Sequence, residues 1–218
     1  MIKPCFDLAS IGLACRQFTL AAAIFAAFFI AGCSSETARL SSLDSDAVIL
    51  AFGDSLTFGT GAGHGHSYPA ELARLTGRKV INGGVPGEIS ATGAKRLPAL
   101  LKRARPDLVI LCHGANDLLR KMNKQQMAEN LRTMIRLAQQ HGTEVVLVGV
   151  PAPRLAFMKT EPIYDTIAQE FNLPYQGTII AELEQEPSLK SDQIHFNAEG
   201  YKRMAEAVYR VLRDNGAL

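Results

Sequence analysis

Residue types that together perform nucleophilic catalysis occur far apart in the sequence. Ser55 stands two residues after Gly53 in AFGDSLTFG, directly after an apolar run, and Asp192 and His195 are three residues apart in SDQIH. A serine becomes a nucleophile when a histidine takes its proton, and a carboxylate can hold that histidine in one orientation. Taken singly, Ser55 is more simply explained as a helix cap, and Asp192 with His195 as a surface pair.

Acyl transfer also needs hydrogen-bond donors for the charge that develops on the carbonyl oxygen. Asn116 follows an apolar run in HGAND, and Gly87 lies in NGGVPGE, where a glycine can present an unobstructed backbone N–H. Both segments are equally compatible with ordinary turns. Three neighbouring polar residues are expected to support these positions by hydrogen bonding: Asp54, His113 and Asp117.

The glycine-rich loop that follows Ser55 fits none of the common glycine motifs. Residues 53–65 contain no lysine, which excludes a P-loop, and histidines interrupt the G-x-G-x-x-G spacing. Thr57 replaces the last glycine of a G-x-S-x-G elbow. His64 and His66 have no carboxylate pair beside them and are weak metal ligands, so we expect a flexible loop here.

Composition points to one ordinary globular domain. The 218 residues are 47% hydrophobic and 20% charged, which is enough for one core and too little for two. The formal net charge is +2 and aromatic residues make up 7%, which argues against a nucleic-acid partner. We expect a monomer that needs neither a metal nor another cofactor.

The N-terminal segment resembles an export signal. Arg16 precedes a mostly apolar stretch, residues 18–32, which is short for a membrane core of roughly 30 Å. The sequence IAGC, ending at Cys33, resembles the bacterial lipobox, which implies cleavage before a lipidated Cys33. A plain signal peptide or an uncleaved anchor is the alternative. Ser34 favours the outer membrane, with the protein facing the periplasm of a bacterial envelope.

These features predict three segments. A lipoprotein-type signal peptide covers residues 1–32, a flexible polar tether covers 33–46, and the folded domain covers 47–218. Cys112 is the one cysteine left in that domain, and its apolar surroundings are typical of a small buried side chain.

Strand-like and helix-like patterns alternate along the domain. Continuous apolar runs that end near glycine predict buried strands, and the runs are residues 47–53, 79–84, 107–114, 144–150 and, more weakly, 174–180. Helical periods separate them, and the segments are residues 67–77, 89–105, 123–142, 160–172 and 197–216. Pro98 is expected to kink or interrupt the second helix. The alternation predicts an α/β fold, a three-layer α/β/α sandwich on a five-stranded, mostly parallel sheet.

Four stretches, FGDSLTFG, GVPGE, GAND and DQIH, resemble in order and spacing the motif blocks of the SGNH hydrolases, also called the GDSL esterase/lipase family. The resemblance spans about residues 47–211. It is strongest with the bacterial periplasmic thioesterase, lysophospholipase and arylesterase branch, to which RLPALLKRARPDLVIL is also similar. His113 and Phe196 depart from the family pattern, where smaller residues and Pro or Leu are common.

The resemblance implies a flavodoxin-like fold and a serine hydrolase that cleaves small-molecule esters or thioesters. Ser55 is then the nucleophile, His195 the base and Asp192 the residue that orients it. The oxyanion hole consists of Gly87, Asn116 and the backbone N–H of Ser55. Three residues between 151 and 164 are expected to line the acyl site: Leu155, Phe157 and Met158.

Two other functions remain open at this point. The same catalytic residues serve carbohydrate O-acetyl esterases of the cell envelope, whose substrates suit an open polar cleft. A lipoprotein that only binds glycans or lipids is the alternative outside the enzymes.

Overall fold

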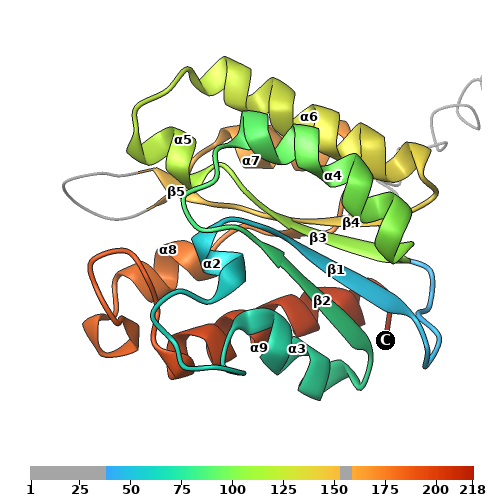
Figure 1. Ribbon diagram of the computed structural model, residues 1–218, viewed down its shortest axis with the longest axis horizontal. Coiled ribbons are helices and arrows are strands. Elements are labelled where there is room, and N and C mark those ends of the chain that lie inside the picture. Colours follow the sequence, from blue (N-terminus) through green and yellow to red (C-terminus); the bar gives the residue numbers. More distant parts are fainter. Residues whose placement is uncertain (1–37, 153–158) are drawn as a thin grey trace, which may run out of the picture. The chain divides into compact units, whose positions relative to one another are not determined.

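The computed structural model describes residues 38–152 and 159–218 (Figure 1). The predicted signal segment and Cys33 lie outside these residues. The central sheet has the strand order β2-β1-β3-β4-β7, and all neighbouring strands are parallel. The strands are β1 (Val48–Gly53), β2 (Lys79–Gly84), β3 (Leu108–Cys112), β4 (Glu144–Val148) and β7 (Tyr175–Gln176). This is the doubly wound, flavodoxin-like order, as predicted.

Helices cover both faces of the sheet (Figure 1). One layer contains α4 (Ser90–Ala104), α6 (Lys124–Gln140) and α7 (Ile163–Glu170), and the other contains α3 (Tyr68–Thr76), α8 (Ile179–Glu184) and α9 (Ala198–Asp214). The shorter elements are α2 (Ser55–Phe58), α5 (Ala115–Leu119), β5 (Pro151–Ala152), β6 (Lys159–Thr160) and η1 (Pro187–Leu189). The predicted three-layer sandwich is therefore confirmed.

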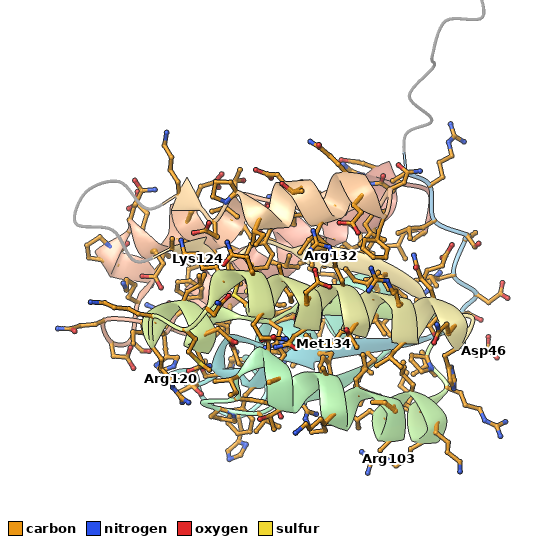
Figure 2. All side chains as sticks on the ribbon, turned by 90° about the horizontal axis from the view of Figure 1, so that it is seen from above. Asp46, Arg103, Arg120, Lys124, Arg132 and Met134 are labelled. Atoms are coloured by element: carbon orange, nitrogen blue, oxygen red, sulfur yellow. The ribbon has the colours of Figure 1, made fainter. Side chains whose placement is uncertain are left out.

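Amphipathic helices bury one face against the sheet, which explains why their sequences repeat every three or four residues. On α6, Met134 is fully buried beneath the helix, whereas Arg132 reaches α7 and donates to Glu170 at 2.7 Å (Figure 2). Asn123 caps this helix, because its side-chain oxygen accepts from the N–H of Gln126 at 3.0 Å.

Pro98 does not interrupt α4, which was one of the two effects expected of it. The helix is continuous from Ser90 to Ala104, and Pro98 lies on its exposed side. There, water can satisfy the carbonyl that has lost its N–H partner. The aligned apolar residues, Leu97 and Leu101, still pack into the core.

The fifth apolar run, residues 174–180, is only partly a strand. Pairing with β4 ends at Gln176, and α8 begins at Ile179. The side chain of Gln176 accepts from the N–H groups of Thr178 at 2.9 Å and Ile179 at 3.1 Å. This local cap starts a helix where continued apolar character had suggested a strand.

Residues 38–46 pack on the domain, although the sequence predicted a flexible tether for 33–46. Leu40 and Leu43 are buried. The N–H of Leu40 donates to the backbone carbonyl of Asn215 and the N–H of Leu43 to that of Ala217, both at 2.9 Å. Ser41 donates its N–H to the carboxylate of Glu144 at 3.0 Å. The two leucines thus have backbone partners near the C-terminus that the polar composition concealed. Within the described residues, no helix is long and apolar enough to cross a membrane.

Candidate active site

Ser55 lies where β1 passes into α2. A Cβ on Gly53 would approach the Cys112 carbonyl oxygen to 2.0 Å and Thr57 Oγ1 to 2.2 Å, so only glycine fits this close crossing. Asp54 caps α2 by accepting from the N–H of Leu56 at 3.1 Å. Ser55 is therefore the first residue of α2, where its own N–H has no partner within the helix.

Asp192 and His195 lie on the loop between η1 and α9. Asp192 Oδ2 accepts from His195 Nδ1 at 2.7 Å, and Oδ1 accepts from the N–H groups of Ile194 at 2.7 Å and His195 at 2.8 Å. The hydrogen bond from His195, together with the two backbone bonds, lowers the pKa of Asp192 to about 2. The carboxylate is therefore ionised at neutral pH.

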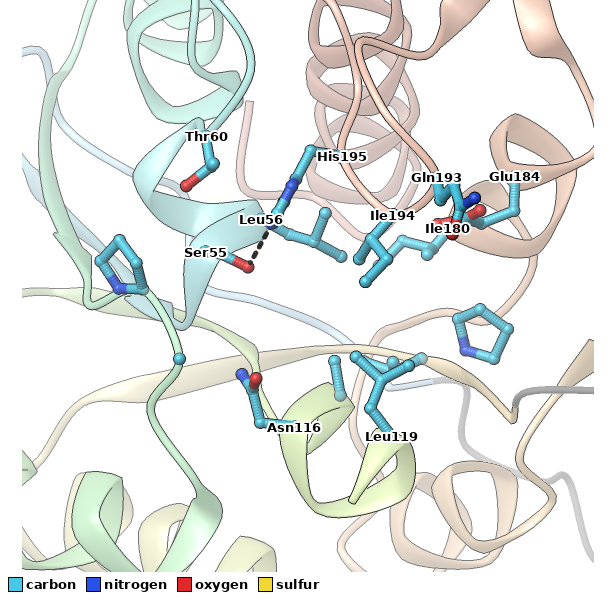
Figure 3. Close-up of a pocket in the computed structure, with 15 residues that line it drawn as sticks. Ser55, Leu56, Thr60, Asn116, Leu119, Ile180, Glu184, Gln193, Ile194 and His195 are labelled. Atoms are coloured by element: carbon cyan, nitrogen blue, oxygen red, sulfur yellow. Dashed lines mark hydrogen bonds between the residues drawn. The ribbon is translucent and has the colours of Figure 1, made fainter. Parts of the chain in front are cut away.

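The fold brings this loop to the serine. Nε2 of His195 lies 3.1 Å from Oγ of Ser55, although 140 residues separate the two in sequence (Figure 3). Because Asp192 accepts the proton on Nδ1, Nε2 carries a lone pair that can accept the serine hydroxyl. This arrangement can remove a proton from Ser55.

Gly87 and Asn116 line the same cleft as Ser55 and His195. Gly87 has φ +75°, and its carbonyl accepts from Arg120 at 2.9 Å. Nδ2 of Asn116 donates to the carbonyl of Glu88 at 3.1 Å and lies 3.4 Å from Asp54 Oδ2. The second contact is weak, so one N–H of this amide can turn to a bound substrate.

The three expected supporting residues all form hydrogen bonds behind the cleft. Asp117 starts α4 by accepting from the N–H of Ser90 at 2.8 Å and from its hydroxyl at 2.6 Å. Asp54 is fully buried, and this burial raises its pKa, although neighbouring His113 opposes the shift. Nε2 of His113 lies 3.2 Å from Oε2 of Glu88.

The sequence did not identify the group at the centre of this network. Glu88 forms a two-point bond with Arg96, at 2.9 and 2.7 Å, and His113 contacts the same carboxylate. Although burial by itself raises the pKa of Glu88, the hydrogen bonds from His113 and Arg96 lower it to about 2. The one hint was position, because Glu88 directly follows Gly87, and Arg96 lies on α4, the helix that begins shortly after it.

His113 fills space that Gly93 of α4 leaves open. A Cβ at Gly93 would lie 2.4 Å from Nε2 of His113, so the two residues are sterically matched. Nδ1 of His113 accepts from the N–H of Gly114 at 2.9 Å, which leaves the proton on Nε2, facing Glu88. The departure of His113 from the family pattern thus adds a donor to the buried carboxylate.

The cleft has a volume of about 510 Å³ and a mostly apolar lining. Next to Ser55 and His195, apolar side chains form the walls, and they include Leu56, Leu119, Val150, Ile180 and Ile194. Glu184 and Gln193 add a polar region at one end (Figure 3). The predicted acyl-site residues Leu155, Phe157 and Met158 lie outside the described residues.

The glycine-rich loop after Ser55 contacts the histidine loop. A Cβ on Gly61 would lie 1.9 Å from Oγ of Ser191 and 2.9 Å from the carbonyl oxygen of Phe196, and its φ is +92°. Tyr201 of α9 donates to the carbonyl of Thr60 at 2.7 Å. The first part of this loop therefore packs against the segment that carries His195, whereas residues 63–66, for which the sequence suggested flexibility, are exposed.

His64 and His66 do not converge on a cation site. His66 lies 3.3 Å from Glu71, which also pairs with Arg74 at 2.6 Å. Within the described ranges, no group of three or more His, Cys, Asp or Glu side chains is arranged to hold a metal ion. Cys112 is buried, as its apolar surroundings predicted.

Residues 51–203 match the GDSL-like Lipase/Acylhydrolase family, and the chain belongs to this family of ester hydrolases. It is 30% identical over 172 residues to Thioesterase 1/protease 1/lysophospholipase L1 of Escherichia coli strain K12, covering 76% of this chain and 83% of that protein. It is 36% identical over 110 residues to Esterase TesA of Pseudomonas aeruginosa, covering 48% of this chain. That alignment spans only 55% of the esterase.

Solved structures agree with this membership. The chain superposes on a crystal structure of TesA with a TM-score of 0.69 and 26% identity, over 77% of this chain and 99% of that one. The fold, the family and the class of enzyme are thus consistent with one another.

Proposed function

We propose that the protein cleaves carboxylic esters or thioesters of small molecules through an acyl-enzyme on Ser55. The observation that carries this proposal is the chain of contacts from Asp192 through His195 to Ser55, at 2.7 and 3.1 Å. The apolar lining of the cleft favours acyl chains over sugars as the bound group. The names of the relatives, which include thioesterase and lysophospholipase, support the same substrate class.

The geometry suggests the following steps. Nε2 of His195 takes the proton of Ser55 as Oγ bonds to the carbonyl carbon, and Asp192 stabilises the imidazolium. The carbonyl oxygen becomes an oxyanion that accepts from Asn116 Nδ2 and from the N–H groups of Ser55 and Gly87. Each such donor is worth about 2.7–4 kcal/mol of barrier in related chemistry.

Collapse of this intermediate breaks the ester or thioester bond, and His195 gives its proton to the leaving alcohol or thiol. Water then attacks the acyl-enzyme, with His195 again as the base, and the acid product leaves. Every proton transfer thus passes through Nε2 of one histidine, whose orientation Asp192 fixes.

Ser55→Ala tests the proposal. We expect the full-length chain with this change to lose at least about 10³-fold of its rate on p-nitrophenyl esters, because Ser55 is the residue, among those that the structure describes, whose hydroxyl is bonded to Nε2 of His195. A fluorophosphonate probe should label the wild type at Ser55 and leave the variant unlabelled. Retention of more than a few per cent of activity by the variant would contradict the assignment.

A substrate series refines the class. We expect rates on p-nitrophenyl esters to rise from acetyl to longer acyl chains, because each added methylene enters an apolar cleft. Lysophosphatidylcholine and an acyl thioester test the lipid and thioester classes, and acetylated xylan tests the sugar esters. Activity confined to acetyl groups would move the proposal to a carbohydrate O-acetyl esterase.

We further propose that the chain is an envelope lipoprotein attached to a membrane through Cys33. This proposal is supported by the IAGC sequence at residues 30–33 and by the apolar segment before it. Cys33→Ala, or treatment of cells with globomycin, should change the mass and processing of the protein. Unchanged processing in both experiments would rule out lipidation at this residue.

A further inference from the structure

The loop that carries Asp192 and His195 has little burial of its own. Residues 191–194 are exposed, and half of the Asp192 side chain faces solvent, at 52%. A bridge between Lys190 and Phe196 closes the loop, and the N–H of Ser191 donates to the carbonyl of His195 at 2.9 Å. These bonds fix the shape of the loop but do not attach it to the wall of the cleft.

Lys190 provides that attachment. Its ammonium group donates to the carbonyl of Gln193 at 2.8 Å and forms an ion pair with Glu184, the last residue of α8. Only 17% of the Lys190 side chain and 9% of the Glu184 side chain are exposed, so water screens the pair weakly. One ammonium thus links α8 to Gln193, which lies between Asp192 and His195.

Glu184 also faces the cleft. Together with Gln193 and with Ile180, one turn earlier on α8, it forms the wall beyond His195 (Figure 3). Burial raises the pKa of Glu184, and the hydrogen bond and charge of Lys190 oppose that shift. The other charged groups around His195 are Asp192 on the same loop and Asp54 before α2.

We propose that Glu184 and Lys190 are positioning residues that hold the histidine loop against α8 and set the charge that surrounds His195. This inference rests on the proposed function, since it concerns the base in that reaction. Loss of either residue leaves the other as a partly buried charge without its partner, which favours opening of the exposed loop. A misplacement of about 1 Å at a reacting group can lower a rate by about 10²-fold.

The first experiment compares Lys190→Met with Lys190→Arg in the full-length chain. We expect Lys190→Met to lower kcat on p-nitrophenyl butyrate by about 10- to 100-fold, with KM changed less than about threefold. Lys190→Arg should retain at least about a third of kcat, because a guanidinium can still donate to both Glu184 and Gln193. Lys202→Met, at an exposed position on α9, is the matched control and should leave kcat unchanged.

The second experiment measures kcat/KM as a function of pH. On the acid side of this profile, the acid limb, kcat/KM falls because the reaction needs the neutral imidazole of His195 as its base. Glu184→Gln removes a negative charge, so the imidazolium is less stable and the acid limb moves to lower pH. Lys190→Met removes a positive charge, so the acid limb moves to higher pH. A pair that merely stabilised the fold would not move the two limbs in opposite directions.

The inference is wrong if Lys190→Met and Glu184→Gln both keep kcat within twofold of the wild type, or if the acid limbs of these two variants shift in the same direction. Circular dichroism and thermal unfolding verify that each variant is folded, and Glu184→Gln serves if Lys190→Met is not. Failure of the proposed function gives a different result, because the wild type would then resist fluorophosphonate labelling. If the probe does label the wild type, a lower rate of labelling for Lys190→Met supports the positioning role.

Discussion

The two sides of the contact between Ser55 and His195 are held in different ways. On the serine side, the supporting carboxylates Asp54, Glu88 and Asp117 are all buried and bonded to groups from other elements. On the histidine side, Asp192 is half exposed, and its bonds go to residues two and three positions along the same loop.

This difference separates two tasks. The proposed oxyanion donors, Gly87 and Asn116, would act best if they were fixed before the substrate binds, and a buried polar network can fix them at the expense of desolvating charges. The proposed base, His195, must move its proton between two oxygens; bonds within its own loop orient the ring, and the Lys190–Glu184 pair holds that loop against α8. We therefore expect changes on the histidine side to impair catalysis with little effect on folding, and changes on the serine side to affect both.

Asp192→Asn gives the largest expected effect on rate. The asparagine oxygen can still accept the two backbone N–H groups, but its amide N–H₂ faces Nδ1 and forces the proton onto Nε2. That is the wrong tautomer for a base, so kcat should fall by about 10³- to 10⁴-fold. The free energy of unfolding, measured with urea, should change by less than about 1 kcal/mol.

Asp214→Asn is the control for this change, since Asp214 is an equally exposed carboxylate that pairs with Arg213. Asp214→Asn should alter neither kcat nor the free energy of unfolding. A large loss of stability in Asp192→Asn would mean that the histidine side is not held locally, and the comparison would fail.

Glu88→Gln is expected to affect both folding and rate. It leaves Arg96 without its carboxylate and places an amide N–H₂ against the donor of His113. The free energy of unfolding at pH 7 should fall by about 3 kcal/mol, and kcat by about tenfold as the adjacent Gly87 shifts. Glu71→Gln removes a carboxylate bonded to the same residue types, Arg and His, near the surface, and should cost less than about 1 kcal/mol.

The pH dependence of stability follows from the same residue. Glu88 has a pKa of about 2 in the folded chain, below its usual value of 4.5, so its ionised form stabilises the fold. This contribution is complete above pH 4.5 and is lost as the pH falls towards 2. The free energy of unfolding of the wild type, measured with urea, should decrease as the pH falls from 4.5 towards 2. Glu88→Gln should lack this part of the decrease. Parallel curves for both proteins would contradict the assigned role.

Gly61→Ala gives the smallest expected change, and it sharpens the comparison at the point where the two sides meet. The added methyl group would press on Ser191 and the carbonyl of Phe196, in a backbone conformation that favours glycine. We expect a loss of about 1–3 kcal/mol in stability and a severalfold lower kcat. Gly77 also has a positive φ, of +66°, but a Cβ added there would have no atom within 4 Å. Gly77→Ala should therefore lower the free energy of unfolding by about 1 kcal/mol and leave kcat unchanged. Equal effects of the two changes would show that the contact with the histidine loop is unimportant.

The alternation of apolar strands and amphipathic helices was enough to predict the layers of the fold. It was less informative where a short side-chain bond decided the structure. Gln176 caps α8 and ends the fifth strand early, and Leu40 and Leu43 find partners at the C-terminus that no local pattern reveals. Exposure likewise explains why α4 continues through Pro98.

The candidate site divides in the same way. Ser55, Gly87, Asn116 and His195 were proposed from short motifs, and the structure places these four in the lining of one cleft. Asp192, proposed in the same way, accepts a hydrogen bond from His195. Glu88 with Arg96, and Glu184 with Lys190, were not identified as pairs. Charged residues are common in any sequence, and their significance here depends on burial and on a partner that only the folded chain brings near.

The sequence by itself determined the family of this protein and its candidate reactive residues, because reactive side chains and the glycines that let strands turn sharply are specified residue by residue. Only the tertiary structure decided that Ser55 and His195, 140 residues apart, lie 3.1 Å from each other. It also decided that the glycine loop after Ser55 supports the histidine loop through Gly61. The physical reason is that parallel strands bring their carboxyl ends to one edge of the sheet, whereas contacts between loops depend on packing across that edge.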